Sequence, residues 1–203
     1  FERKSLGQSY DGSALILHEM ACRLAGTTGE DGVGIRTTLK ALCRYGTPPE
    51  EMCPYHTQKA HQERFDLSLI GFRRELKGLR YFRLDPPHLS GHEVLAQLKS
   101  FLAAGFPVLL GFPVPRSLTN NGIIPYRPRY ESYRGGQTVL AVGFDDRQLL
   151  GQGALKIRNS WGMAWGEDGY GWLSYSQVTK QLAADCWTVF RNSWAGVKIY
   201  QPC

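Results

Sequence analysis

GGQTVLAVGFDDRQLLGQGALKIRNSWGMAWGEDGYGW, residues 135–172, is the stretch of sequence that decides the fold. Two segments in which apolar and polar side chains alternate are separated by a turn rich in Gly and Asp, and a loop rich in Gly and Trp follows them. Alternation with a period of two, bounded by such residues, is typical of β-strands. The stretch therefore predicts strand, turn, strand, loop and strand, with Gln137 at the start of one strand and Asn159 and Trp161 at the end of its neighbour.

The motif NSWGxxWGxxGY, which begins at Asn159, resembles a motif of the papain-like cysteine peptidases. Its Trp and Gly residues stand at fixed offsets that are improbable by chance. In that family a histidine opens the preceding strand and an asparagine orients its imidazole. This chain has Gln137 where the family has the histidine. The resemblance implies an α+β, two-lobed fold, with a helical first lobe, an antiparallel, β-barrel-like second lobe and a cleft between them.

The resemblance also locates the position of the nucleophile. The family's cysteine follows Gly-Ser at the start of a buried helix, six residues after a glutamine that helps to bind the oxyanion. Gln8 and the tripeptide Gly12-Ser13-Ala14 fit that pattern, with alanine in place of cysteine. The separations from Ala14 to Gln137 and Asn159 are close to the roughly 130–150 residues of papain-like enzymes. Because the chemistry needs a thiolate and an imidazole, the resemblance implies a catalytic frame that lacks both reacting groups.

Composition is that of one globular domain. The chain has 203 residues, of which 42% are apolar, so we expect a single papain-like domain, with a helical lobe at about 1–90 and a β lobe at about 91–203. No apolar run approaches the roughly 18–20 residues of a membrane span, and the first residues lack the apolar core of a signal peptide. Because the sequence begins without Met, we expect one domain of a larger or processed protein.

Charge and cysteine content exclude other classes of function. The net charge is +6 and the pI about 9.1, but the basic residues are dispersed, so we expect no nucleic-acid partner. The five cysteines are Cys22, Cys43, Cys53, Cys186 and Cys203. Their odd number without C-x-x-C spacing disfavours zinc and a full disulfide framework, although a Cys43–Cys53 bridge stays open. We expect no metal or cofactor, and a reducing compartment such as the cytoplasm is favoured.

The rest of the chain shows helical and strand patterns in the order that the resemblance implies. Helices are predicted over 14–24, 34–45 and 58–76, and Ser90 with Glu93 predicts a capping box before a fourth helix. Strands are predicted over 79–85 and from 106 onward. His18 and Cys22 share one face of the first helix and so cannot flank a substrate carbonyl, which makes them core residues rather than a displaced catalytic pair.

A long loop between 117 and 134 precedes Gln137. Its aromatic and basic residues are of the types enriched where proteins meet partners. They are Tyr126, Arg129, Tyr130, Tyr133 and Arg134. Two interpretations stay open, since these side chains either bind a partner or cover the sheet.

Two functions compete. The first is a pseudopeptidase that binds a peptide, a protein partner or a small ligand in the former cleft, because a triad without its reacting groups retains only roughly 10³–10⁴-fold acceleration over water. Its binding residues are predicted to be Gln8, Ser13, Tyr130, Tyr133, Arg134, Gln137 and Trp161. The second is an active cysteine peptidase whose nucleophile was changed to Ala14, although Gln137 argues against it. Use of Ser13 as a nucleophile is disfavoured because no base stands at position 137.

Overall fold

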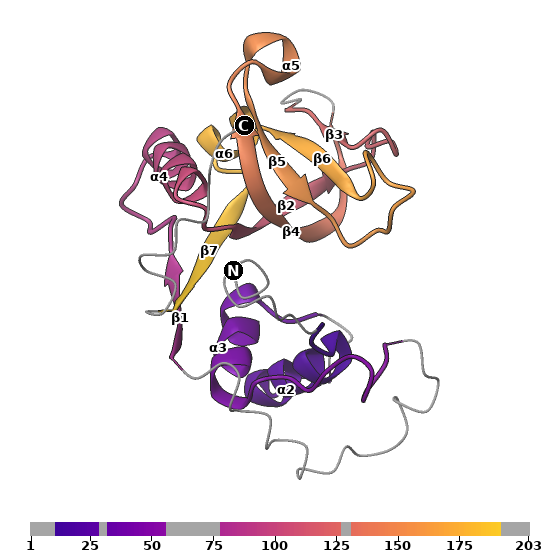
Figure 1. Ribbon diagram of the computed structural model, residues 1–203. Coiled ribbons are helices and arrows are strands. Elements are labelled where there is room, and N and C mark those ends of the chain that lie inside the picture. Colours follow the sequence, from indigo (N-terminus) through magenta and orange to yellow (C-terminus); the bar gives the residue numbers. More distant parts are fainter. Residues whose placement is uncertain (1–10, 29–31, 56–77, 127–130, 192–203) are drawn as a thin grey trace. The chain divides into compact units, whose positions relative to one another are not determined.

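The computed structural model describes residues 11–28, 32–55, 78–126 and 131–191 (Figure 1). The described residues divide into two compact units: the first contains those up to Arg80 together with Phe190 and Arg191, and the second runs from Tyr81 to Val189. The sequence interpretation placed this division near residue 90. The positions of the two units relative to each other are not determined, so each is described by itself. No helix among the described residues is long and apolar enough to span a bilayer.

The first unit contains two helices. Helix α2 spans Ala14–Ala25 and helix α3 spans Ile35–Tyr45, and each ends at a glycine with positive φ, Gly26 or Gly46. Their apolar faces form a small core whose buried members are Ile16, Met20, Ala21, Ala41 and Cys53. Both helices agree with the sequence prediction. The helix predicted over 58–76 lies outside the described residues.

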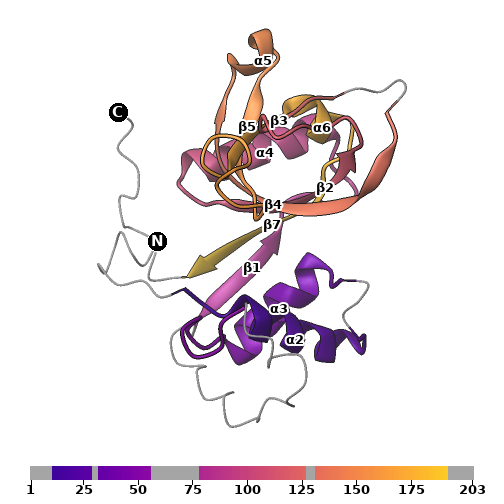
Figure 2. The same ribbon diagram turned by 90° about the vertical axis from the view of Figure 1, so that its right-hand side faces the viewer.

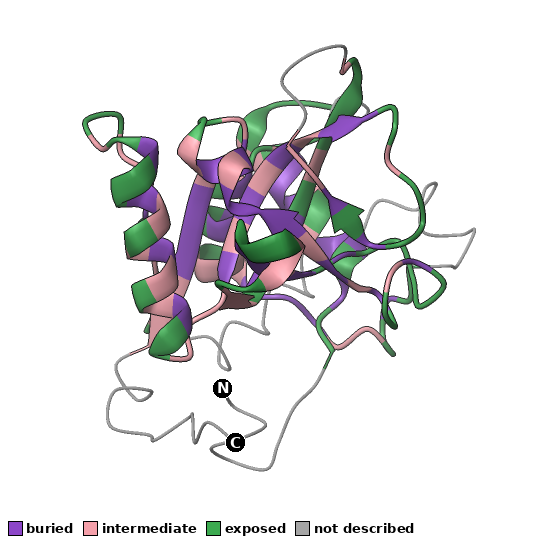
Figure 3. Cartoon of the chain, turned by 90° about the horizontal axis from the view of Figure 1, so that it is seen from above, coloured by how far each residue is buried: buried purple, intermediate pink, exposed green. Residues whose placement is uncertain are grey.

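The second unit opens with strand β1, Leu79–Arg83, whose first two residues belong to the first unit, and with helix α4, Gly91–Ala103. The predicted capping box is confirmed, because the Ser90 hydroxyl accepts from the Glu93 N–H while the Glu93 carboxylate accepts from the Ser90 N–H at 2.7 Å. The buried residues of α4 face the sheet and its exposed residues face away (Figure 3). The helix therefore covers one side of the β core.

A seven-stranded mixed sheet forms the body of the second unit, in the order β1-β7-β2-β4-β5-β6-β3 (Figure 2). The remaining strands are β2 (Val108–Pro115), β3 (Ile123–Ile124), β4 (Tyr133–Asp145), β5 (Ala154–Arg158), β6 (Tyr170–Ser174) and β7 (Ala184–Arg191). The short helix α6, Tyr175–Thr179, follows β6. The pairs of β2 with β4 and β7, and of β5 with β4 and β6, are antiparallel, while β3 is parallel to β6. The prediction that this lobe closes as a barrel stays a prediction.

Two features of the sheet differ from the sequence interpretation. The turn between β4 and β5 contains a short helical turn, α5 (Gln148–Gly151), in which Leu149 and Leu150 adopt left-handed conformations with φ of 52° and 59°. Such a conformation costs a residue with a side chain roughly 1–2 kcal/mol, so sequence alone points to the neighbouring Gly and Asp residues instead. The long loop after β2 contains the two-residue strand β3, which is too short to produce a recognisable alternation.

Candidate functional site

A hydrogen bond joins Gln137 to Asn159. Gln137 lies on β4 opposite Phe112 of β2, and Asn159 follows the last residue of β5. The Nε2 of Gln137 donates to the Oδ1 of Asn159 at 2.9 Å and to the Oγ of Ser160 at 3.2 Å. The neighbouring strands β4 and β5 therefore bring Gln137 and Asn159 together, and the Gln137 carboxamide donates to the asparagine.

Asn159 is fixed by several further contacts. Its Oδ1 also accepts from the Ser160 N–H at 2.8 Å, and its own N–H donates to the Gly169 carbonyl at 2.9 Å. The residue is buried, and its Nδ2 has no partner among the described residues. Leaving a buried donor unpaired costs about 1–3 kcal/mol. The remaining contacts of Asn159 must offset this cost, and they hold its Oδ1 toward Gln137.

Two tryptophans form an edge-to-face pair beside this bond. The ring centroids of Trp161 and Trp165 lie 5.6 Å apart with an interplanar angle of 88°. Trp165 is buried, whereas Trp161 is 40% exposed. A Cβ at Gly171 would lie 2.6 Å from the Trp165 ring, so the tight packing of Trp165 depends on that glycine. The buried ring thereby sets the orientation of the exposed one.

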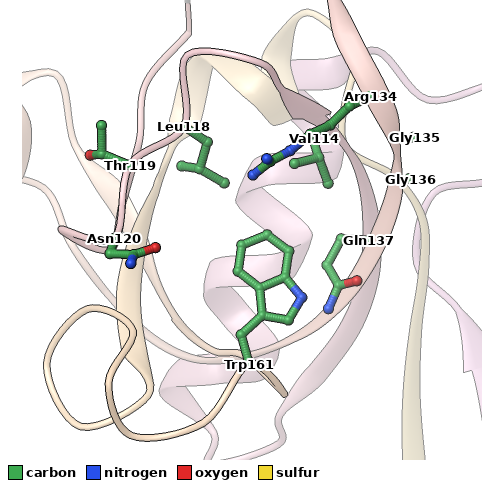
Figure 4. A pocket seen from close by; sticks show the side chains of 9 residues that line it. All are labelled: Val114, Leu118, Thr119, Asn120, Arg134, Gly135, Gly136, Gln137 and Trp161. Atoms are coloured by element: carbon green, nitrogen blue, oxygen red, sulfur yellow. The ribbon is translucent and has the colours of Figure 1, made fainter.

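Gln137 and Trp161 border a cavity of about 370 Å³ that lies within the second unit. Figure 4 shows the indole of Trp161 on its floor, with the side chains of Gln137 and Arg134 on one side and those of Leu118 and Asn120 on the other. Its described lining residues are Val114, Leu118, Thr119, Asn120, Arg134, Gly135, Gly136, Gln137 and Trp161. Ligand pockets are typically about 300–1,000 Å³, so the cavity is of a size to hold one side chain or a small group.

Backbone hydrogen bonds hold the wall that carries Asn120. The Gly166 N–H donates to the Asn120 carbonyl at 2.8 Å, and the Trp172 N–H donates to the Gly122 carbonyl at 2.7 Å. A Cβ at Gly122 would lie 2.7 Å from the Cα of Gly166, so the two segments touch backbone to backbone. These bonds form the cavity wall without any ligand, as a preorganised site requires.

The start of α2 belongs to the first unit. Ser13 is fully buried, and its hydroxyl donates to the Cys53 carbonyl at 2.7 Å and accepts from the Ile16 N–H. Ser13 is therefore a helix cap, and it is left out of the binding residues proposed below. Ala14 is exposed, and its N–H donates to Oε2 of Glu50 at 3.3 Å. Oε1 of Glu50 accepts from the Tyr55 N–H at 2.6 Å, so the carboxylate is held in place at the first turn of the helix.

The predicted site residues are thus only partly gathered. Arg134, Gln137 and Trp161 line one cavity, while Tyr133 lies next to Arg134 on β4 without lining it. Gln8 and Tyr130 lie outside the described residues. Because Ala14 belongs to the first unit and Gln137 to the second, their predicted facing across a cleft stays a prediction.

The sequence interpretation missed seven residues of the site: Val114, Leu118, Thr119, Asn120, Gly135, Gly136 and Ser160. The Asn120-Asn121-Gly122 tripeptide was the available signal, because such residues form tight turns that return the chain on itself. The Asn121 Oδ1 accepts from the Ile123 N–H at 3.0 Å, as in an Asx turn. That turn carries Asn120 to the cavity.

The described cysteines are free and do not form a reactive pair. Burial raises the pKa of the Cys43, Cys53 and Cys186 thiols, which disfavours their reactive thiolate forms. The Cys22 Sγ lies 3.5 Å from the His18 Nε2 on one face of α2, as the sequence predicted. Cys22 is buried, but His18 is exposed, so the prediction that His18 is a core residue is wrong. Within the described part of the chain no three side chains of His, Cys, Asp or Glu gather as a metal site would require.

The two-unit α+β fold and the Gln137–Asn159 pair define the class of protein. Residues 20–190 match the model of the papain family of cysteine proteases, and the chain belongs to this family. The matched region includes Gln137, Asn159 and the Trp-Gly motif. It begins after Ala14.

Known relatives agree with this membership. An uncharacterized peptidase C1-like protein, L477, of Acanthamoeba polyphaga mimivirus is 29% identical in an alignment of 185 residues that covers 87% of this chain. The chain spans 58% of the length of that curated relative. Among solved structures, xylellain, a cysteine protease from Xylella fastidiosa, superposes with a TM-score of 0.76 and 29% identity over 94% of this chain and 74% of its own.

A more distant structure shows the same fold. The proform of the Amb a 11 cysteine protease, a ragweed pollen allergen, superposes with a TM-score of 0.66 at 20% identity, over 94% of this chain and 55% of its own. At that identity the likeness concerns the fold alone.

Proposed function

We propose that this chain is a catalytically inactive papain-like domain that binds a peptide or a protein segment without cleaving it. The observation that supports the proposal is the hydrogen bond from Gln137 to Asn159. Gln137 occupies the position that the resemblance gives to a catalytic histidine. A carboxamide does not gain or lose a proton near neutral pH. It therefore cannot take a proton from a nucleophile or return one to a leaving amine, which is the work of a general base.

The surroundings of Ala14 support the same proposal. A methyl group cannot attack a carbonyl, and the carboxylate of Glu50 lies against the Ala14 N–H. Backbone N–H groups at such positions stabilise the oxyanion in acyl-transfer enzymes. In this chain the Ala14 N–H already donates to the Glu50 carboxylate. The negative charge of Glu50 would also disfavour a thiolate or an oxyanion beside it.

The cavity beside Gln137 and the loop that adjoins it are the proposed binding site. Their preformed wall, the exposed indole of Trp161 and the polar groups at the rim are features of sites that bind peptides through a few anchoring contacts. The alternative remains an active cysteine peptidase in which Ala14 replaces the nucleophile. Retention of Asn159 and Trp161 supports it, whereas loss of the base at Gln137 does not.

The test is to incubate the purified chain, under reducing conditions and at stoichiometric concentration, with casein and with a random peptide library. We expect no thiol-dependent cleavage of either, together with selective retention of some library members. The Ala14→Cys variant separates the two candidates, because restoring the thiol alone should restore reductant-dependent cleavage only if the chain is a peptidase whose nucleophile was changed. Cleavage of casein by the native chain that requires reductant would overturn the proposal.

A further inference from the structure

The cavity beside Gln137 has an unbalanced charge. Among its described lining residues Arg134 is the one charged side chain, and no carboxylate accompanies it. Arg134 is exposed on β4 and forms no ion pair with the described residues. Nearby Glu131 accepts hydrogen bonds from the hydroxyl and the N–H of Ser117. An arginine that projects into a recess without a counter-charge favours an anionic ligand.

The direction of the side chain strengthens this point. Figure 4 shows the guanidinium of Arg134 reaching into the cavity above the indole of Trp161, toward Leu118. A guanidinium presents several N–H donors in a planar fork that matches a carboxylate. The Asn120 carboxamide and the Thr119 hydroxyl, which line the cavity across from Arg134, can donate further hydrogen bonds. The Nε2 of Gln137 already donates to Asn159 and Ser160. Arg134, Asn120 and Thr119 therefore give the cavity several hydrogen-bond donors.

The cavity also has an apolar part, which restricts the kinds of ligand that can fill it. Val114, Leu118 and Trp161 offer apolar surface within the same 370 Å³. A ligand that fills the cavity therefore combines a carboxylate with an apolar group a few ångströms away. The free C-terminus of a peptide that ends in an apolar residue carries both on one Cα atom, whereas an Asp or Glu side chain carries the carboxylate alone.

We infer that this cavity binds a carboxylate of the peptide ligand through Arg134, and that a C-terminal carboxylate next to an apolar side chain suits it best. The inference rests on the proposed function, because it assigns the ligand chemistry of the same site. It adds a preference for ligands with a carboxylate, which follows from the charge of Arg134 and not from the residues at the catalytic positions.

The experiment titrates the ¹⁵N-labelled full chain with three peptides and follows the indole N–H resonance of Trp161. The peptides are acetyl-Ala-Leu as the free acid, acetyl-Ala-Leu amide, and acetyl-Ala-Asp-Leu amide. We expect the free acid to bind at least about tenfold more tightly than the first amide, because a hydrogen-bonded charge is lost in the amide. Binding should weaken as NaCl is raised, since the contact is partly exposed.

Matched variants locate the contact. Arg134→Gln should lose at least about tenfold in affinity for the free acid, and Arg134→Lys should retain part of it as a point charge without the fork. Arg147→Gln removes an arginine that is 94% exposed and outside the cavity, and should leave the affinity unchanged. Because Arg134 is exposed, its replacement should leave the amide spectrum that of a folded chain.

The outcomes separate this inference from the proposed function. Preference for either carboxylate peptide that depends on Arg134 supports the inference, and the two arms tell a C-terminal from a side-chain source. Equal binding of all three peptides, or no binding of any peptide, overturns it. Hydrolysis of a peptide overturns the proposed function, while the dependence of affinity on Arg134 is still read from the same titration.

Discussion

The Nε2 of Gln137 donates to the Oδ1 of Asn159 at 2.9 Å, joining the first half of β4 to the residue that follows β5. The bond pairs Asn159 with the residue at the position that the resemblance gives to the histidine of papain-like enzymes. A hydrogen bond of this kind contributes about 0.5–1.5 kcal/mol net, so it stabilises the fold whether or not any chemistry follows.

Replacement of Gln137 tests the structural worth of that bond. Gln137→Leu should lower the free energy of unfolding by about 1 kcal/mol, because Asn159 would lose a donor at its buried Oδ1. Gln137→His, which keeps an N–H, should lose less. Urea unfolding measures both, with Thr138→Leu as an exposed control on the same strand. A Gln137→Leu variant as stable as the parent would mean that the bond contributes nothing.

Restoring the reacting groups tests the predicted position of Ala14. In the double variant Ala14→Cys, Gln137→His, the introduced thiol should react with iodoacetamide faster than the buried Cys22, because a facing imidazole lowers a thiol pKa. Adding Glu50→Gln should speed the reaction several-fold more, because the carboxylate beside the Ala14 N–H disfavours a thiolate.

Site-specific alkylation is followed by mass spectrometry, with the exposed neighbour Glu51→Gln as the control. An introduced thiol that reacts no faster than Cys22 would show that positions 14 and 137 do not face each other. If Glu50→Gln and Glu51→Gln changed the alkylation rate equally, the charge of Glu50 would have no specific effect on a thiol at position 14.

Replacement of Gly122 tests whether the cavity wall depends on its close contact with Gly166. A Cβ at this residue would lie 2.7 Å from the Cα of Gly166 and 3.0 Å from the Tyr170 carbonyl, and its φ is +74°. Gly122→Ala should therefore destabilise the fold by more than about 2 kcal/mol, since a steric clash adds to the roughly 1–2 kcal/mol of a left-handed residue. Gly151→Ala, with φ of +84° and open space around it, isolates the backbone cost alone. If thermal unfolding showed that Gly122→Ala and Gly151→Ala lose the same stability, close packing at Gly122 would be contradicted.

The carboxylate of Asp146 gives the stability a predictable dependence on pH. Its Oδ1 accepts from the Lys99 Nζ at 2.6 Å and from the Tyr175 hydroxyl at 2.7 Å, and these bonds, that from Lys99 first, lower the pKa of Asp146. A lowered folded-state pKa stabilises the fold above the unfolded value of about 3.9, and this contribution is lost as the pH falls through the folded value.

Asp146→Asn should thus lower Tm by about 1–3 °C at pH 7 and by almost nothing near pH 2. Calorimetry across that range measures it, with the exposed Asp168→Asn as control. If the Tm of Asp146→Asn were still lower than that of the parent at pH 2, the loss of stability would come from packing and not from the charge of Asp146.

Local features of the fold were readable from the sequence because they depend on neighbours in the chain. The Ser90–Glu93 capping box, the glycines after α2 and α3 and the alternation in β4 and β5 follow from short-range geometry. The Gly-Trp motif after Asn159 likewise sufficed to predict the papain-like class. The left-handed Leu149 and Leu150 were missed because leucine rarely adopts this conformation, and β3 was missed because two residues give no recognisable alternation.

The sequence by itself predicted the frame of the site, namely alanine and glutamine at the positions that the resemblance gives to cysteine and histidine, with Asn159 to pair with Gln137. Only the tertiary structure decided which residues share a cavity, because Val114, Asn120, Arg134 and Trp161 come from four separate segments that the sheet and its backbone hydrogen bonds bring together. Side chains far apart in the chain have no local signal of their proximity. The excess of positive charge in the cavity is therefore a property of the folded second unit.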